Sequence, residues 1–161
     1  MAPNNKIITI NQFKKLGLQD KDKKVVFTNG CFDVIHYGHA QYLYNASELG
    51  DILVIGLNSD DSVKRLKGDD RPINNVDARA YLLSSFYFVD YVIIFDEDHP
   101  YKFLQNVKHN VLVKGGYYQI DNIVWAHILK ELGGDVVVLP FVEGYSSTNI
   151  IKKMNFTHGK K

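Results

Sequence analysis

The chain has 161 residues, of which 45% are hydrophobic and 23% are charged, a composition typical of a soluble globular domain. Its formal net charge of +1 argues against a general nucleic-acid-binding surface, and its single cysteine cannot form an intramolecular disulfide. The sequence shows neither the apolar run of a signal peptide nor the ~20 apolar residues that a membrane span needs. We therefore expect one cytoplasmic domain over residues 1–161, with flexible ends at about 1–6 and 155–161.

The first part of the chain alternates short helices with apolar runs of strand length. Residues 7–10 and a candidate N-cap, Asn11, lead into a short helix, and a strand is expected at 25–27. A later helix, with apolar residues at i, i+3 and i+4, ends at Gly50. The run 51–58 is continuously apolar, which is typical of a strand covered on both faces.

The second part of the chain continues this alternation. Further strands are expected at 89–95, 111–114 and 136–140. Further helices are expected after Ser59, after Asn75 (with Tyr81, Leu82, Leu83 and Phe86 in the core), from His99–Pro100, at about 121–132, and from a cap at Ser146 or Ser147 to about Met154. A basic loop is expected at 64–71. The alternation predicts an α/β fold: a single Rossmann-like domain whose five-stranded parallel sheet has helices on both faces.

The strongest functional signal lies between the strand at 25–27 and the helix that follows it. Gly30 marks a turn, and His36 and His39 bracket Gly38 where the helix begins. A helix N-terminus offers unpaired N–H groups and partial positive charge to a phosphate. Gly38 lets a ligand approach the backbone, and imidazoles at i and i+3 project from one side. The segment therefore predicts a polyphosphate site.

The same residues allow three other interpretations. The histidines can be solvated or capping residues. Cys31, His36 and His39 can be zinc ligands, although no C-x-x-C or second His/Cys cluster supplies a fourth. Cys31 can also be a nucleophile, although the sequence marks no base for it.

The segment T-N-G-C-F-D followed by H-Y-G-H resembles the signature of the cytidylyltransferase-like nucleotidyltransferases. Within that family the chain is most similar to the ADP-heptose synthase adenylyltransferases. Three further motifs match in order: R-L-K-G-D-D-R-P at 65–72, L-V-K-G-G at 112–116 and E-G-Y-S-S-T-N-I-I at 143–151. The resemblance covers about residues 6–154.

The resemblance implies nucleotidyl transfer. An oxygen of a heptose 1-phosphate attacks the α-phosphorus of ATP in line, and pyrophosphate leaves. The attacking phosphate is already ionised and needs no general base. Mg²⁺ is expected to arrive on the triphosphate rather than in a metal site of the protein. The expected partners are ATP, a sugar 1-phosphate and a separate sugar kinase that makes it, without nucleic acid or membrane; a homodimer stays open.

The resemblance also implies roles for particular residues. His36, His39 and Lys67 are expected to be catalytic, the histidines as hydrogen-bond donors to the triphosphate. The expected nucleotide-binding residues are Cys31, Phe32, His36, Gly38, His39, Lys114, Gly144, Tyr145, Ser146, Ser147 and Thr148. The expected contacts of the sugar phosphate are Asp33, Lys64, Arg71 and Arg79, with Asp33 orienting either the turn or a substrate hydroxyl. Which of Lys64, Arg65 and Lys67 is the main phosphate contact stays open.

Two departures from the family pattern bear on specificity. Relatives commonly carry K-G-G-D, whereas here Tyr117 follows Gly116. Cytidylyltransferases carry R-T-E-G where this chain has Phe141-Val142-Glu143-Gly144, and the missing arginine weighs against CTP. One alternative is a cytidylyltransferase that uses CTP with glycerol 3-phosphate or another sugar or polyol phosphate. Another is a nucleotide-binding module without activity, which would need the phosphate cradle but not both histidines.

Overall fold

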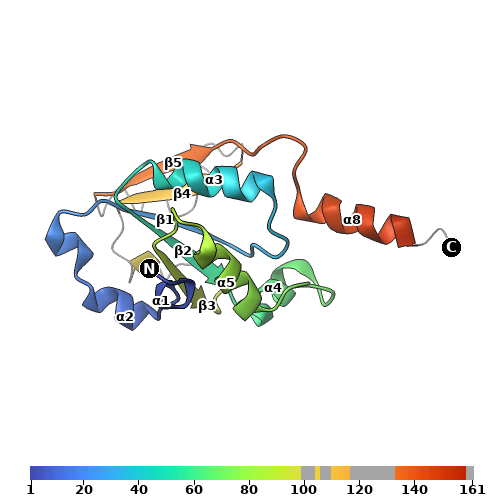
Figure 1. The fold of residues 1–161 in the computed structure, drawn as a ribbon, viewed down its shortest axis with the longest axis horizontal. Coiled ribbons are helices and arrows are strands. Elements are labelled where there is room, and N and C mark those ends of the chain that lie inside the picture. The colour runs from blue at the N-terminus through green and yellow to red at the C-terminus, as the bar shows by residue number, and fades with distance from the viewer. Residues whose placement is uncertain (99–103, 106–109, 117–132, 159–161) are drawn as a thin grey trace.

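The computed structural model describes residues 1–98, 104–105, 110–116 and 133–158. These residues form one sheet of five parallel strands in the order β3-β2-β1-β4-β5, which confirms the predicted α/β class (Figure 1). The strands are β1 (Val25–Gly30), β2 (Ile52–Asn58), β3 (Tyr91–Phe95), β4 (Val111–Gly115) and β5 (Asp135–Leu139). The chain order reverses between β1 and β4, where ligands bind in open α/β sheets.

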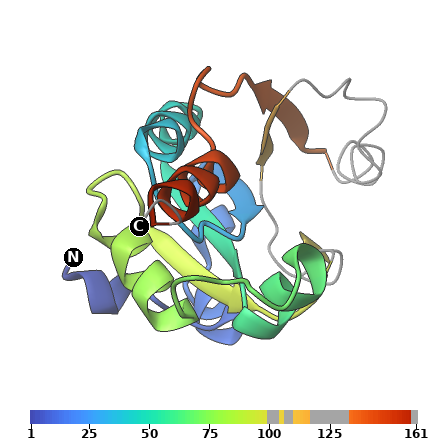
Figure 2. The ribbon, with the colours of Figure 1, turned by 90° about the vertical axis from the view of Figure 1, so that its right-hand side faces the viewer.

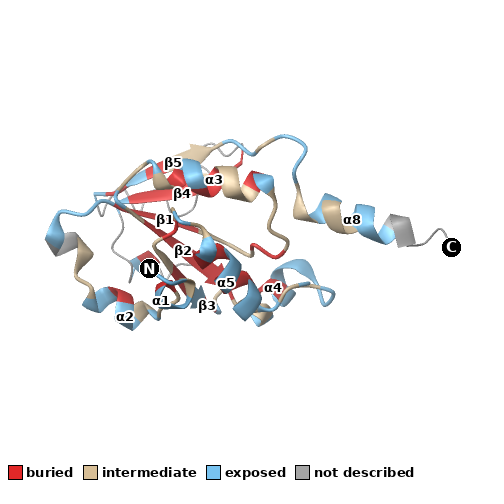
Figure 3. Ribbon diagram, in the orientation of Figure 1, coloured by how far each residue is buried: buried red, intermediate tan, exposed pale blue. Residues whose placement is uncertain are grey.

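Helices cover both faces of this sheet, as predicted. They are α1 (Pro3–Lys6), α2 (Ile10–Lys15), the 3₁₀ helix η1 (Leu18–Lys21), α3 (Tyr37–Ser47), α4 (Asp60–Lys67), α5 (Val76–Ser85) and α8 (Ser147–His158). Side chains alternate along β1, so Phe27 packs with Phe13 of α2 in one core. Val26 lies in the other core with Leu43 of α3 and Leu83 of α5. Figure 3 shows the buried residues concentrated in the strands between these layers.

Residues Pro3–Lys6 form the short helix α1, in the segment where the sequence predicted a flexible start. Lys6 is buried in α1, and its Nζ donates a 3.0 Å hydrogen bond to the carbonyl oxygen of Phe86. The N-cap of α2 is Thr9 rather than Asn11. Thr9 and Gln12 form a capping box, which satisfies two backbone N–H groups reciprocally and so outcompetes the later asparagine.

Helix α4 contains most of the basic residues that the sequence placed in a loop. Ser59 caps its N-terminus by accepting a 3.1 Å hydrogen bond from the backbone N–H of Ser62. Acidic residues occupy its first turn and basic residues its last, which suits the helix dipole. The helix ends at Gly68, whose φ of 103° lies in the left-handed region that favours glycine. Lys64, Arg65 and Lys67 are therefore helical.

The last helix is longer than expected. Its cap is Ser146, whose Oγ accepts a hydrogen bond of 3.4 Å from the backbone N–H of Asn149, and it continues past Met154 to His158. Nothing between these positions breaks a helix, because the stretch holds neither glycine nor proline. Figure 1 shows α8 extending beyond the sheet, and Figure 2 views the molecule from that end.

Other expectations differ in detail or fall outside the described residues. Helix α5 buries Leu83, but Tyr81 and Leu82 are about half exposed, because only one side of the helix packs on the sheet. The helices expected from His99–Pro100 and at 121–132 lie outside the described residues, as does Tyr117. No described helix has the length and apolar character to cross a membrane.

Candidate active site

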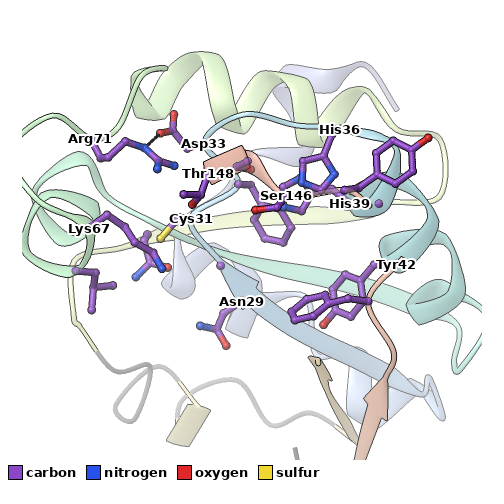
Figure 4. A pocket seen from close by; sticks show the side chains of 18 of the residues that line it. Asn29, Cys31, Asp33, His36, His39, Tyr42, Lys67, Arg71, Ser146 and Thr148 are labelled. Carbon is purple, nitrogen blue, oxygen red and sulfur yellow. Dashed lines mark hydrogen bonds and ion pairs between the residues drawn. The ribbon is translucent and has the colours of Figure 1, made fainter. Parts of the chain in front are cut away.

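A cavity of about 680 Å³ opens at the carboxyl ends of β1 and β2 (Figure 4). Most of its lining comes from the turn after β1, the start of α3, the end of α4 and the segment that leads into α8. Of the residues expected to be functional, those in its lining are Cys31, Phe32, Asp33, His36, Gly38, His39, Lys67, Arg71, Tyr145, Ser146, Ser147 and Thr148. Lys64, Arg79, Lys114 and Gly144 are not in the lining.

The two histidines form a stacked pair at the start of α3. His36 is the N-cap residue, and its ring centroid lies 3.8 Å from that of His39. The ring of Phe32 meets His39 edge to face at 5.3 Å. The Nδ1 atoms of both histidines are buried without a hydrogen-bond partner among the described residues. Buried polar atoms are normally paired, so two unpaired ones on neighbouring rings mark this pair as a feature that calls for a functional explanation.

Burial sets the charge of these imidazoles. It lowers the pKa of His36, and it lowers the pKa of His39 to about 4, with the neighbouring His36 contributing in the same direction. His39 is therefore neutral at pH 7. A neutral imidazole has one N–H donor, which can bond to a phosphate oxygen without a proton being transferred.

Gly38 allows two elements to approach closely beside the histidines. A Cβ at this position would lie 3.1 Å from the Cε1 and Nδ1 atoms of His36 and 3.1 Å from the Cβ of Tyr145. A side chain here would therefore push the segment before α8 away from α3. The sequence predicted this glycine as a point of ligand approach, and the structure adds a packing reason for it.

Asp33 binds the chain itself. Its side chain is 1% exposed and accepts hydrogen bonds from Arg71 Nε at 2.5 Å and from the backbone N–H groups of Ile73 and Asn74 (Figure 4). Burial raises the pKa of Asp33, but the hydrogen bonds from Asn74, Ile73 and Arg71 outweigh it and hold this pKa below its usual value. These contacts support the turn-orienting role rather than contact with a substrate hydroxyl, and they give Arg71 a partner on the cavity wall.

Arg79 occupies a different position from the one expected for a phosphate contact. Its side chain is 0% exposed, and its guanidinium donates to the carbonyl oxygens of Cys31, Asn58 and Asn74. A further bond of 2.7 Å reaches Asp60. Direct contact with the sugar phosphate does not fit this burial. The arginine instead ties together the backbone at the base of the cavity.

The basic residues of α4 separate into different environments. Arg65 pairs with Asp98 at 2.7 Å and with Asp96 at 3.6 Å, and Lys64 lies 3.9 Å from Asp69. Lys67 lines the cavity and has no hydrogen bond or ion pair with the described part of the chain. Lys67 is thus the lysine of α4 best placed to meet a phosphate.

Cys31 has the character of a neutral thiol. Burial raises its pKa, although Lys67, Arg79 and Arg71 act against this. A raised pKa disfavours the thiolate that a nucleophile or a zinc ligand needs. The described residues also contain no group of three or more His, Cys, Asp or Glu side chains that could hold a metal ion.

Lys114 is not in the cavity lining but bonds to a residue that is. Its Nζ donates to Oδ1 of Asn29, a lining residue, and burial lowers the pKa of Lys114 to about 8.

Sequence reasoning missed several lining residues: Asn29, Tyr42, Asn58, Leu66, Asp98 and Val142. Asn29 and Asn58 carried a usable signal, because each is a polar residue at the carboxyl end of an apolar strand.

The segment before α8 closes one side of the cavity. Ser147 Oγ donates a 2.8 Å hydrogen bond to the carbonyl oxygen of Val34, in the turn after β1. Phe141 is also a lining residue, and a Cβ built on Gly115 would lie 2.8 Å from its Cε1. The ring of Phe141 therefore packs against the end of β4.

Paired imidazoles and a helix N-terminus at the carboxyl edge of a parallel sheet are typical of a nucleotide-binding α/β domain. The chain belongs to the cytidylyltransferase-like family, whose model matches residues 27–153. It is thus a nucleotidyltransferase domain, as its four motifs predicted.

Longer proteins are among its relatives. The chain is 53% identical over 150 residues to "Bifunctional protein HldE" of Nitratiruptor sp., with 90% of this chain and 32% of that protein covered. The protein of the same name from Campylobacter concisus is also 53% identical, with 93% and 31% covered. The chain therefore spans about a third of the length of these relatives.

Two solved structures resemble the fold. A lipopolysaccharide core biosynthesis protein from Thermoplasma volcanium superposes with a TM-score of 0.60 and 27% identity, covering 77% of this chain and 99% of that one. A pantoate-beta-alanine ligase from Francisella tularensis superposes with a TM-score of 0.61 over 92% of this chain and 76% of that one. At 16% identity the second likeness concerns the fold alone.

Proposed function

We propose that this domain transfers the adenylyl group of ATP to a heptose 1-phosphate, giving ADP-heptose and pyrophosphate. The observation that carries the proposal is the stacked pair of His36 and His39, whose buried Nδ1 atoms have no partner among the described residues. The four sequence motifs of the ADP-heptose synthases and the relatives named HldE support the choice of substrates.

The reaction is a direct displacement. An oxygen of the sugar phosphate forms a bond to the α-phosphorus, the bond from that phosphorus to the bridging oxygen breaks, and the electron pair leaves with pyrophosphate. No proton has to move, because the attacking oxygen is already ionised. Catalysis then requires alignment of two polyanions and stabilisation of the charge that develops on the phosphate oxygens. Mg²⁺ enters as part of the triphosphate substrate.

The residues around the cavity suit these tasks. His36 and His39 donate hydrogen bonds to the triphosphate, and Lys67 neutralises charge from the end of α4. Ser146, Ser147 and Thr148 present the N-terminus of α8, whose partial positive charge favours an anion. The sugar 1-phosphate is itself the product of a kinase reaction, which we assign to a separate sugar kinase activity.

The test is a panel of triphosphates against phosphorylated acceptors, with pyrophosphate release as the measurement. ATP with a heptose 1-phosphate is expected to give the highest kcat/KM among ATP, CTP, GTP and UTP combined with heptose, hexose and glycerol phosphates. A His36→Ala, His39→Ala double variant is the control for contaminating activity. Preference for CTP with glycerol 3-phosphate would establish the cytidylyltransferase alternative, and the absence of pyrophosphate release with every pair would overturn the proposal.

A further inference from the structure

Tyr145 contacts a catalytic histidine from outside the helix that carries it. Its ring stacks on that of His36 with centroids 6.2 Å apart and an interplanar angle of 27°. A second ring, that of Tyr37, lies 5.1 Å away. The motif E-G-Y-S-S-T places Tyr145 among the expected nucleotide-binding residues but gives its aromatic ring no particular task. The role of this side chain therefore has to come from the structure.

Hydrogen bonds within the described chain do not orient the imidazole of His36. The residue caps α3 through its backbone, but its side chain makes no capping bond and its Nδ1 has no described partner. Ring packing therefore determines the orientation of this imidazole. His39 supplies one packing surface from the same helix, and Tyr145 supplies the other from the segment before α8.

Tyr145 is itself held in place from two sides. Its Cβ lies 3.1 Å from the place that a Cβ at position 38 would take, so Gly38 lets the tyrosine approach α3 closely. Two residues further along, Ser147 Oγ bonds to the carbonyl oxygen of Val34 and fixes this segment to the turn after β1. The side chain of Tyr145 is about half exposed on the cavity wall, so it is placed by these contacts and is not buried for packing alone.

We propose that Tyr145 is a positioning residue for the reaction, whose aromatic ring holds the His36 imidazole in the orientation that meets the triphosphate. The inference rests on the proposed function, since it assigns Tyr145 a task in that same site. The ring performs this task, and the hydroxyl is not required. A small misplacement of a catalytic group reduces its contribution to the rate steeply, which is why a stacking partner matters.

The first experiment observes His36 without substrate. The ¹⁵N signals of the six histidines are followed by NMR over pH, with His36 assigned from the spectrum of a His36→Gln variant. Tyr145→Ala is expected to raise the pKa of His36, because burial lowers this pKa and the substitution exposes the ring. Tyr145→Phe keeps the ring and is expected to leave the titration unchanged.

Other charged groups near the imidazole have to stay constant in this comparison. His39 is the titrating group stacked on His36. Lys67, Arg71, Asp33 and Asp98 line the same cavity from other elements. None of them contacts Tyr145 by a hydrogen bond or ion pair in the described structure, so the substitution leaves their charges in place.

The second experiment separates kcat from KM. Tyr145→Ala is expected to lower kcat about tenfold or more while KM for ATP changes less than threefold, and Tyr145→Phe is expected to stay within about twofold of the parent. Tyr145→Leu keeps apolar volume without an aromatic ring and tests packing if the alanine variant folds poorly. Tyr87→Ala is the matched control, since Tyr87 is 82% exposed and does not line the cavity.

The two experiments test the positioning role of Tyr145 and the proposed function separately. An unchanged His36 titration in Tyr145→Ala, or an equal loss of kcat in Tyr145→Phe, would overturn the positioning role. If no pair of substrates gives pyrophosphate, the proposed function fails, and the NMR comparison still determines whether Tyr145 orients His36.

Discussion

The guanidinium of Arg79 donates a 2.6 Å hydrogen bond from Nη1 to the carbonyl oxygen of Cys31, joining helix α5 to the turn after β1. The same nitrogen donates at 2.8 Å to the carbonyl oxygen of Asn58, at the end of β2. One fully buried cation thus links the carboxyl ends of two neighbouring strands. Cys31 and Asn58 both line the cavity, so Arg79 determines the shape of its base without touching it.

Replacing Arg79 is expected to reduce stability before it affects substrate affinity. Arg79→Ala removes a hydrogen-bond donor from three carbonyl groups and the partner from Asp60, so the free energy of unfolding should fall by roughly 3–5 kcal/mol in urea titrations. Arg79→Lys keeps the positive charge and should recover only part of this loss, because an ammonium cannot reproduce the guanidinium fork. Arg65→Ala, at an exposed ion pair, is the control and should change stability little. A stable Arg79→Ala variant with only a raised KM for the sugar phosphate would restore the phosphate-binding role.

Removing either histidine is expected to abolish most turnover and to preserve the fold. In the proposed mechanism each imidazole acts on charge that grows in the transition state, where one lost donor costs ~10²–10³ in rate. His36→Ala and His39→Ala should therefore lower kcat by about that factor, as measured by pyrophosphate release. Melting temperatures near that of the parent would show that the loss is chemical. A variant with parental kcat would remove its histidine from catalysis.

Acid should destabilise the free protein through His39. Its pKa is about 4 when folded, against an ordinary value of 6.5, so the unfolded chain binds a proton more readily in this window. The stability present above pH 6.5 is then lost as pH falls from 6.5 through 4, by about 2 kcal/mol on going from pH 7 to pH 4.5. The carboxylate of Asp33 adds a loss in the same direction at lower pH, since its folded pKa also lies below its ordinary value.

Urea titrations of the parent and of His39→Gln at pH 7 and pH 4.5 measure this loss. Glutamine does not titrate, so the variant should lose about 2 kcal/mol less than the parent between the two pH values. Equal losses in the two proteins would assign the acid sensitivity to other groups.

Prediction from sequence succeeded where the signal is local. Buried parallel strands are continuous apolar runs, so β2 and β4 were located to within a residue or so of their ends. The predicted end of α4 was wrong, because the basic last turn of this helix, with Lys64 and Lys67, has the composition of a loop. Gly68, with its positive φ, is the residue that terminates the helix.

The sequence predicted the histidine motif of the site, but it did not predict the hydrogen bonds and ring contacts around that motif. His36, Gly38 and His39 are close in sequence, and their spacing shows that they share a helix start. The partners of Arg79 lie up to 48 positions away, so only the folded chain shows that this arginine is buried and bonded to the backbone at the base of the cavity. The stacking of Tyr145 on His36 likewise depends on the folded chain, because it requires the segment before α8 to pack against the start of α3.

Nucleotide binding is expected to be linked to protonation of Lys114. Burial lowers the pKa of this lysine to about 8, and a triphosphate bound nearby would favour the charged form and raise that pKa. Binding of ATP at pH 8 should therefore take up as much as about half a proton per site. Calorimetry in buffers of different ionisation enthalpy measures the uptake, and Lys114→Met should abolish it. The same uptake in the variant would exclude Lys114 from the nucleotide site.

The identity of the base should depend on Phe141. An adenine ring offers a donor amine beside ring-nitrogen acceptors, whereas cytosine pairs its amine with a carbonyl acceptor that a strong donor such as arginine can bind. Phe141 lines the cavity with an apolar ring that packs but cannot donate. We therefore expect ATP to be preferred over CTP by at least ~100-fold in kcat/KM, about 2.7 kcal/mol of differential transition-state binding.

Substitutions at position 141 test whether the missing hydrogen-bond donor, and not another part of the pocket, selects the base. Phe141→Arg supplies a guanidinium at the point where cytidylyltransferases carry one, so the ratio of kcat/KM for ATP to that for CTP should fall at least ~10-fold. Phe141→Leu adds no donor and should keep the parental ratio, since the side chain at 141 is 59% exposed and little packing is lost. Competition assays with both triphosphates and one sugar phosphate measure the ratio directly. Equal use of ATP and CTP by the parent would show that the base is selected elsewhere, and a parental preference for CTP would make the domain a cytidylyltransferase.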